Sequence, residues 1–334
     1  MNHFSILSPA PGGTYPEALA SLFEKLRDHF TAEAAQGRRP VFVRFFLSDA
    51  QNQAAALQAA LQTRGWDIPA VSLVEQPPLD GSHVTALVQT ADERADFLFH
   101  SLRLSEEEAA GRDSYAQSRL LFDKYLDIIR PLGLDLKTHC VRTWIYVRDI
   151  DANYAGLVKA RNDVFDEEGL SHDTHYIAST GIGGATDGRS AVVAIDFLTY
   201  PGIRESDKTY LKALSHLSPT HDYGVAFERA VRLSGGKIFI SGTASIDKHG
   251  HVLHEGDVLA QADRLLENID TLLAEGGSSL KRVPYFIIYL RDISDYAVVN
   301  AYMQRRFPTV PRVLLEARVC RPAWLIEMEC ETDN

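Results

Sequence analysis

Apolar residues recur along the chain in two spacings, one typical of helices and one typical of strands. The clearest helical stretch, 258–274, gathers its leucines on one face and stops at Gly276 and Gly277. An apolar strand follows over 286–292, and a second helix over 293–307 ends before Pro308. This order of helix, strand and helix predicts a unit in which two helices pack on a sheet.

The same order occurs three times, which predicts three copies of one unit. The middle copy has a helix over 115–129 and a strand over 143–149, whose segment Ile-Tyr-Val-Arg-Asp matches Ile-Tyr-Leu-Arg-Asp in the third copy. The first copy is less regular, and its predicted segments are helix 17–33, strand 41–49, a helix to 61, and strands 70–74 and 84–90. We expect an α+β fold of mixed sheets backed by helices, in a pseudo-threefold arrangement of units 1–80, 81–225 and 226–334.

The end of the chain is predicted to form a hairpin of two short strands, 312–319 and 324–330, joined by a turn at 321–323. Alternation along the second strand places Glu327 and Glu329 on one face with Leu325. The opposite face is predicted to carry Trp324, Ile326 and Met328. Such a strand is either an exposed surface hairpin or a pair of carboxylates built into a site, and the pattern alone leaves both open.

An aspartate ends the strand in each copy, at Asp49, Asp149 and Asp292. Because an Asp just before a helix accepts hydrogen bonds from free backbone N–H groups, these residues are predicted to be helix caps rather than catalytic groups. A glycine-rich stretch, 179–184, is predicted to lie at the end of a strand in the irregular segment 171–227. It matches neither a phosphate-binding loop nor the dinucleotide fingerprint, so no nucleotide is predicted.

Composition narrows the classes of function. The 334 residues are 45% hydrophobic, enough for a large core, and the net charge of −11 argues against a general nucleic-acid or anionic-membrane surface. An anion site would have to be built from a few placed arginines. No apolar run approaches the roughly 20 residues of a membrane span, and the start lacks a basic segment followed by an apolar one, so we expect a cytoplasmic protein.

The sequence shows no residue pattern typical of a metal site or of a disulfide framework. The three cysteines, Cys140, Cys320 and Cys330, show no CxxC spacing, and the histidines show no ligand pattern. We therefore expect no disulfide framework, no metal and no cofactor.

The third unit resembles the Rid (YjgF-type) family over 227–331. The resemblance rests on the strand and turn 236–245, the Arg-Asp strand, Asn300, and the ending with Arg312 and Glu327. It implies Rid/YjgF-like (chorismate-mutase-like) units, with Arg312 as a substrate-binding residue and Glu327 fifteen residues later. Rid proteins are homotrimers with sites between subunits. Three units in one chain then look like a fused trimer, which we expect to be a monomer with one site between the second and third units.

A narrower resemblance is to the chorismatases, which are built on the Rid fold. It rests on the segments 141–146, 180–183, 223–224, 241–245 and 317–321, together with Glu327. It implies a cofactor-free enzyme that binds the small anion chorismate and cleaves its enolpyruvyl ether, releasing pyruvate. Glu327 would be the general acid, protonated because burial raises its pKa. In this family a cysteine at the place of Cys320 goes with the branch that forms 3-hydroxybenzoate, with 4-hydroxybenzoate as a further product. A cysteine in a strand is equally often a small buried apolar residue.

The remaining candidates would bind the substrate. Arg312 would hold a carboxylate bidentately, unless it is merely an exposed arginine after a proline. Alternation along strand 142–148 points Arg142, Trp144 and Tyr146 towards a seam between units, where they would bind the ring and a second carboxylate or simply pack the interface. Further candidates are Arg161, Tyr223, Gly242, Thr243 and Ala244.

Three alternatives stay open at this point. A hydrolytic chorismatase would give a dihydroxycyclohexadiene carboxylate, and Ala244 leaves that branch open. A Rid-type hydrolase of enamines or imines would need Arg312 and Glu327 but not Cys320. A non-catalytic binder of small anions would not need Glu327.

Overall fold

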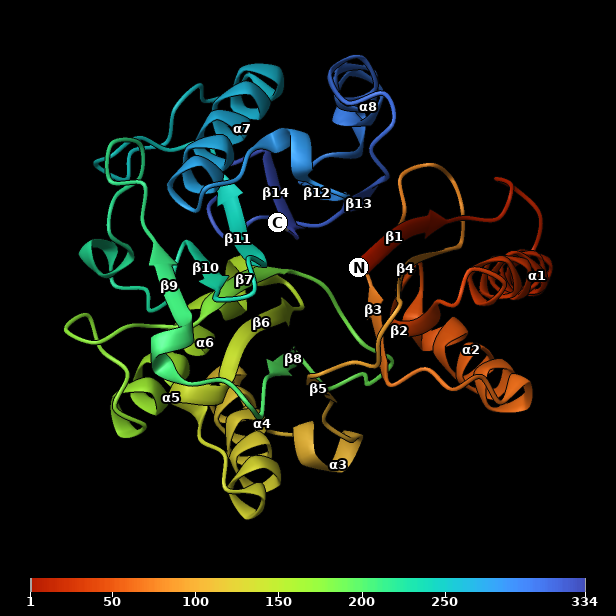
Figure 1. The fold of residues 1–334 in the computed structure, drawn as a ribbon, viewed down its shortest axis with the longest axis horizontal. Helices are drawn as coiled ribbons and strands as arrows, with labels where there is room; N and C mark the ends of the chain where they lie inside the picture. Colours follow the sequence, from red (N-terminus) through yellow and green to blue (C-terminus); the bar gives the residue numbers. More distant parts are fainter. Residues whose placement is uncertain (1, 334) are drawn as a thin grey trace.

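The computed structural model describes residues 2–333, except for the side chain of Tyr223. It arranges them as three sheet-and-helix units around a central axis (Figure 1). The strand orders are β1-β4-β2-β3, β5-β8-β6-β7, and β13-β12-β14-β11, the last extended by β10 and β9. One outer pair in each unit is parallel, and the other pairs are antiparallel. The predicted α+β architecture of three mixed sheets backed by helices is confirmed.

The first unit pairs four strands with two amphipathic helices. Its elements are β1 (Asn2–Leu7), α1 (Tyr15–Ala34), β2 (Arg39–Leu47), α2 (Ala50–Arg64), β3 (Ala70–Glu75) and β4 (Val84–Ala91). The apolar stripe of α1 is buried against the sheet. Asp49 caps α2 by accepting a hydrogen bond from the Asn52 amide at 3.3 Å, as predicted. β4 belongs to this sheet although the predicted unit stops at residue 80.

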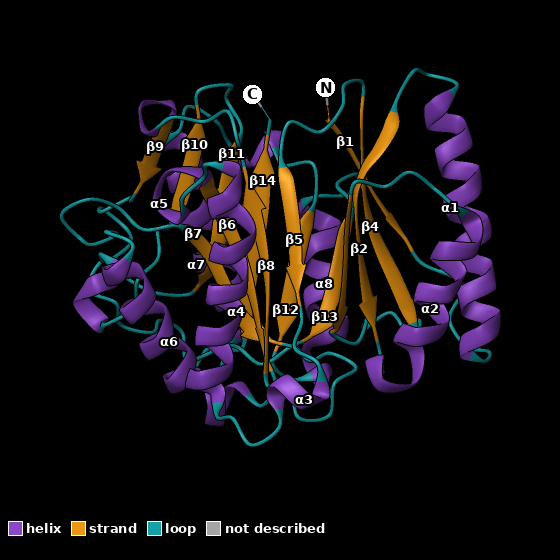
Figure 2. Cartoon of the chain, turned by 90° about the horizontal axis from the view of Figure 1, so that it is seen from below, coloured by secondary structure: helices purple, strands orange, loops and turns teal. Residues whose placement is uncertain are grey.

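The second unit repeats this plan. Its elements are β5 (Leu98–Leu102), α3 (Glu106–Ala109), α4 (Ser114–Ile129), η1 (Arg130–Leu132), α5 (Leu136–His139), β6 (Cys140–Val147), α6 (Ile150–Glu167), β7 (Ala178–Gly183) and β8 (Val193–Thr199). The helices α4 and α6 cover the outer face of the sheet, where Ile145 and Val147 of β6 join their core. In Figure 2 the helices α1, α2, α4 and α6 lie outside the strands.

Two sequence predictions in this unit are corrected. The glycine-rich stretch does not follow a strand but is itself β7, the edge strand that pairs in parallel with β6. Asp149 stands at the N-cap position of α6 with a left-handed φ of 45°, and its side chain makes no capping hydrogen bond. The backbone turn there, rather than the carboxylate, starts the helix.

The third unit has the longest sheet. Its elements are η2 (Glu205–Asp207), β9 (Lys208–Leu211), η3 (Thr220–Tyr223), β10 (Ala230–Leu233), β11 (Ile238–Ala244), α7 (Val258–Glu275), η4 (Leu280–Arg282), β12 (Phe286–Leu290), η5 (Ile293–Asp295), α8 (Tyr296–Arg306), β13 (Arg312–Glu316) and β14 (Ile326–Thr332). β9 joins this sheet although it precedes the predicted start at 226. Asp292 caps η5 by accepting from the Ser294 amide at 2.8 Å.

The predicted C-terminal hairpin is wrong, because β12 lies between β13 and β14. β13 pairs in parallel with β12 after the crossover through α8, whereas β14 pairs in antiparallel fashion on the other side of β12. The connection 317–325 therefore passes the end of β12 and reaches the second unit, where Val319 bridges Ile182 of β7. Trp324 precedes β14, so the strand alternation does not place it.

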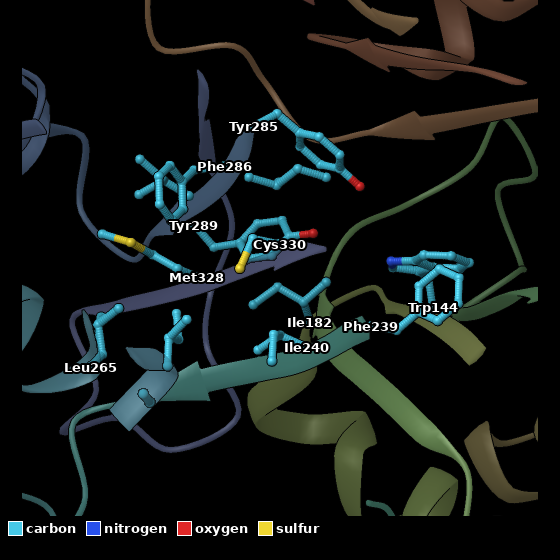
Figure 3. Close-up of a cluster of buried hydrophobic side chains, with 14 of the residues drawn as sticks. Trp144, Ile182, Phe239, Ile240, Leu265, Tyr285, Phe286, Tyr289, Met328 and Cys330 are labelled. Atoms are coloured by element: carbon cyan, nitrogen blue, oxygen red, sulfur yellow. The ribbon is translucent and has the colours of Figure 1, made fainter. Parts of the chain in front are cut away.

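A large hydrophobic core joins the units around the axis. It runs from the third unit into β6 and β7 and reaches Phe42 and Phe46 of the first unit. In Figure 3, Trp144 of β6 lies against Phe239 of β11, and Ile182 of β7 lies near Ile240. The seam between the second and third units is thus a packed interior. None of the helices within residues 2–333 has the length and apolar character needed to cross a membrane.

Candidate active site

A cavity of about 250 Å³ opens at the seam between the second and third units. Its walls come from α6, β7, β11, the segment before β10, and the connection that leads into β14. Five of the residues predicted from the sequence line it together: Glu327, Cys320, Arg161, Gly242 and Ala244. The predicted site between the second and third units therefore has a physical cavity.

Glu327 is held in the centre of a sheet. Its strand neighbours are Tyr289 of β12 and Ala244 of β11, and the residue is 5% exposed. Burial, followed by the negative charge of Glu329, raises its pKa to about 8. The exposed-hairpin interpretation is excluded, and the carboxyl is mostly protonated at neutral pH.

A bulge in β11 makes room for this carboxyl. The register between β11 and β14 shifts between Ile240 and Thr243, and the freed Gly242 amide donates to Thr180 Oγ1 at 2.9 Å. A Cβ on Gly242 would overlap Glu327 Oε1, so glycine is required at this close approach. Ala244 lines the cavity, whereas the Thr243 hydroxyl donates to the Ser241 carbonyl at 2.9 Å and lies outside the lining.

Cys320 reaches the cavity because the connection before it is tied to β7. The Gly183 amide donates to the Arg318 carbonyl at 2.8 Å, and a Cβ on Gly183 would lie only 2.8 Å from the Arg318 nitrogen. Burial, followed by the charge of Glu327, raises the pKa of the Cys320 thiol to about 12. Cys320 is therefore a neutral thiol in the cavity wall, not a thiolate nucleophile.

Two buried arginines supply positive charge to the cavity. Arg161 of α6 is 2% exposed, and its Nε and Nη2 have no hydrogen-bond partner among the described residues. Arg229 is also buried, and its Nη2 donates to the Ser218 carbonyl at 3.0 Å. The two guanidinium groups lie 6.0 and 5.2 Å from the centroid of the Phe227 ring. Because it is costly to bury the Arg161 guanidinium with two N–H-bearing nitrogens unsatisfied among the described residues, this wall is suited to an anionic ligand.

Tyr154 and Arg229 are among the cavity residues that the sequence analysis did not single out. Tyr154 lies seven residues before Arg161 on α6, so helical periodicity places both on one face and was a usable signal. Arg229 follows an irregular segment without periodicity, and no local pattern indicates its direction. Tyr223 falls in η3, but its side chain lies outside the described residues.

Three predicted residues lie behind the cavity rather than around it. Arg142 Nη2 forms an ion pair with Glu329 Oε2 at 2.9 Å, and Trp144 Nε1 donates to Glu329 Oε1 at 2.9 Å. The Tyr146 hydroxyl donates to Asp196 at 3.3 Å. These side chains do point into the seam, as the alternation along β6 predicts, but they pack it instead of lining the cavity.

Arg312 lies in a different cleft, of about 540 Å³, between β1 of the first unit and β13 with α8 of the third. Its guanidinium donates to Asn300 Oδ1 and to the Phe307 carbonyl, each at 3.4 Å, and also to Gln304. The structure thus does not bring Arg312 and Glu327 together. Across the described part of the chain, no group of three or more His, Cys, Asp and Glu side chains is placed to hold a metal ion.

Comparisons with known proteins agree with this architecture. The family described as Endoribonuclease L-PSP matches residues 218–332. The 3-aminoacrylate deaminase RutC of Acinetobacter baylyi is 34% identical over 93 residues, which are 27% of this chain and 74% of RutC. A chorismatase of Streptomyces hygroscopicus is 28% identical over 256 residues, covering 70% of this chain and 71% of that protein.

A chorismatase crystal structure has the same fold along the whole chain. It superposes with a TM-score of 0.69 at 21% identity, covering 99% of this chain and 98% of the other. The chain therefore belongs to the Rid/YjgF-like superfamily, in which it is a homologue of chorismatase with repeated Rid-like units in one polypeptide.

Proposed function

We propose that this protein is a chorismatase that cleaves the enolpyruvyl ether of chorismate into pyruvate and 3-hydroxybenzoate. The observation that carries the proposal is the seam cavity, which places a protonated carboxyl, Glu327, beside two buried guanidinium groups. The chorismatase homologue from Streptomyces hygroscopicus supports the choice of substrate.

Chorismate carries two carboxylates, and the cavity offers two guanidinium groups for them. Two N–H-bearing nitrogens of Arg161 have no partner among the described residues, and Arg161 and Arg229 both lie within 6.0 Å of the centroid of the Phe227 ring. Charge-assisted hydrogen bonds from guanidinium to carboxylate are short and strong, and they fix orientation as well as affinity. We assign the substrate carboxylates to Arg161 and Arg229 rather than to Arg312, which lines the other cleft.

Glu327 then acts as the general acid. Its proton is transferred to the terminal carbon of the enolpyruvyl group, and the resulting oxocarbenium ion makes pyruvate a good leaving group. The neighbouring ring hydroxyl displaces pyruvate, its proton restores the acid, and the ring rearranges to the phenol. Chorismate and the two products contain the same atoms, so no water is consumed. General acid catalysis of this kind contributes roughly 10²–10⁴-fold.

The wall of the cavity supports the route without water. Cys320, Ala244 and Trp324 line it near Glu327, and none of them is a charged group that would hold an attacking water. Cys320 remains a thiol, which is a weak hydrogen-bond donor with mainly apolar character. The hydrolytic alternative consumes one water, which adds to the oxocarbenium carbon, so the water oxygen leaves in the keto group of pyruvate and the ring keeps its ether oxygen as a hydroxyl of the dihydroxycyclohexadiene carboxylate.

The test is to incubate the purified protein with chorismate, couple pyruvate to lactate dehydrogenase, and identify the aromatic product by chromatography. We expect pyruvate and 3-hydroxybenzoate in equal amounts. Absence of pyruvate at micromolar enzyme would refute the proposal, and a dihydroxycyclohexadiene carboxylate would replace it by the hydrolytic reaction.

The acid role has its own test. Glu327→Gln should lower pyruvate release by roughly 10²–10⁴-fold, because the amide cannot give up a proton. The same change at Glu331, which is buried on the same strand but pairs with Lys237 at 2.7 Å, is the matched control and should retain activity. Undiminished turnover in Glu327→Gln would show that another group supplies the proton.

A further inference from the structure

A second buried carboxylate lies beside the proposed acid. Glu329 follows Glu327 by two positions on β14, so both side chains project from the same face of the strand. Both residues are buried. A negative charge held on one of two neighbouring carboxyl groups disfavours ionisation of the other, so the partners of Glu329 bear on the proton of Glu327.

The second unit holds the charge on Glu329. Arg142 Nη2 lies 2.9 Å from Oε2, the Trp144 indole N–H donates to Oε1 at 2.9 Å, and the Thr180 hydroxyl donates to Oε2. Thr180 in turn accepts from Arg142 at 2.6 Å and from the Gly242 amide at 2.9 Å. The Glu329 carboxylate is therefore oriented by three donors and is linked through Thr180 to the bulge beside Glu327.

The first unit adds a second cation beside Glu329. Arg44 of β2 is 1% exposed and lies 3.7 Å from Glu329 Oε1 and 3.7 Å from Asp196 Oδ2. Its guanidinium stacks on the Trp144 ring at 4.4 Å from the centroid. Without a carboxylate at position 329, Arg44 and Arg142 would face the interior of the seam with less negative charge to balance them.

We propose that Glu329 is a positioning residue, an anion clamped by Arg142, Trp144 and Thr180 that keeps the adjacent Glu327 carboxyl in its acid form. This inference rests on the proposed role of Glu327 as general acid. It explains how Glu327 keeps its proton in a seam with several buried arginines: the charge of Glu329 balances Arg142 and Arg44, the two arginines that it contacts.

The groups that face Glu327 divide into two opposing sets. Glu329 of its own strand opposes ionisation, as does its burial. The cations that favour ionisation are Arg142 of β6 and Arg229 before β10. The remaining titratable neighbours are Tyr289 of β12, Tyr154 and Cys320, and they are neutral because burial raises the pKa of each. Arg161 and Arg321 line the same cavity. Removing the charge of Glu329 should therefore leave burial to oppose the effect of Arg142 and Arg229 on the pKa of Glu327.

The substitution Glu329→Gln removes this charge while keeping the shape of the side chain. For pyruvate release, the limb of kcat/KM that falls with rising pH should move to lower pH by roughly 1–3 units. Glu329→Asp, which retains the charge, should leave this limb close to its wild-type pH. A merely structural role would lower activity at every pH without moving the limb.

Two substitutions of other buried carboxylates serve as matched controls. Asp196→Asn removes another buried carboxylate that contacts Arg44, but from β8 rather than from the strand of Glu327. Glu331→Gln removes the next carboxylate on the same face of β14, which pairs with Lys237. Neither should move the limb, and an equal shift in either control would overturn the assignment to Glu329.

A measurement without substrate separates this inference from the proposed function. The carbonyl stretch of the protonated Glu327 carboxyl can be followed by infrared spectroscopy as a function of pH, with Glu327→Gln identifying the band. In Glu329→Gln the titration midpoint should fall, and an unchanged midpoint would refute the inference even if pyruvate is released. Failure of the wild type to release pyruvate would refute only the function, because the infrared titration still reports on the carboxyl.

Discussion

The Glu327 carboxyl is buried, and it lies beside the negative charge of Glu329; both favour its neutral form. This state suits proton donation at neutral pH, and it has a cost for the folded protein at high pH. An unfolded chain ionises its glutamates near the ordinary pKa of 4.5, whereas the folded protein holds this proton until about 8. Between these values the folded state binds the extra proton, so stability falls as pH rises.

Glu327→Gln should therefore become relatively more stable with increasing pH. The gain over wild type should grow between the two pKa values by up to about 1.4 kcal/mol per pH unit, because glutamine never ionises. Urea unfolding of both proteins at several pH values measures it. A stability difference that does not change with pH would contradict the buried, protonated state.

Gly242 shows how one missing Cβ shapes the site. In Gly242→Ala the new methyl would overlap Glu327 Oε1 and Thr180, so the acid must move away from its present position. We expect pyruvate release to fall by about 10²-fold, since misplacement by about 1 Å has this effect, while the fold persists. Gly235→Ala is the control, because nothing lies within 4 Å of a Cβ there. Equal activity of the two variants would contradict the close approach.

At the level of elements, the seam depends on how strands from different units meet. The helices and most strands agree with the sequence-based prediction, because amphipathic periodicity is a local property of the chain. The C-terminal hairpin was wrong because pairing partners are not local: β12, which precedes both strands, takes the place between them. Because of that arrangement, the connection 317–325 lies against β7, and Cys320 lines the cavity.

Of the arginines predicted to bind the substrate, Arg161 lines the seam cavity and Arg312 lies in the cleft beside β1. Arg161→Met should lower kcat/KM for chorismate by roughly 10–100-fold, because a charge-assisted hydrogen bond is worth about 1.5–3 kcal/mol. Arg312→Met, in the cleft beside β1, should stay within about twofold of wild type on the same scale. Steady-state assays of pyruvate release decide between them, and a larger loss in Arg312→Met would return the substrate to the site expected from the Rid resemblance.

At the level of the whole molecule, the three units share one buried charge cluster near the axis. Arg44 comes from the first unit, Arg142 and Asp196 from the second, and Glu329 from the third. The first unit adds no residue to the cavity, yet it supplies the cation that contacts carboxylates of both other units. The first unit therefore contributes to the packing of the other two units, through the contacts of Arg44 with Asp196 and Glu329.

Arg44→Met should consequently destabilise the fold by about 1–3 kcal/mol, because Asp196 and Glu329 each lose one of two cations and keep Arg103 and Arg142, respectively, at 2.9 Å. Arg64→Met, whose pair with Glu24 at 3.4 Å is largely exposed, should change stability by less than about 1 kcal/mol. Equilibrium unfolding in urea compares the two variants. Similar small losses in both would show that Arg142 and Arg103 are enough to balance the cluster.

Periodicity and motif spacing are local properties of the chain, and they are enough to predict the repeated helix-and-strand units and their mixed-sheet fold. They also single out Glu327 and Cys320 as candidate site residues. Only the tertiary structure decided which arginines face the acid, why Gly242 must be glycine, and that Arg142 and Trp144 hold Glu329. The physical reason is that these contacts join different units. The direction of a side chain across a seam depends on the packing of sheets far apart in sequence, which no local pattern records.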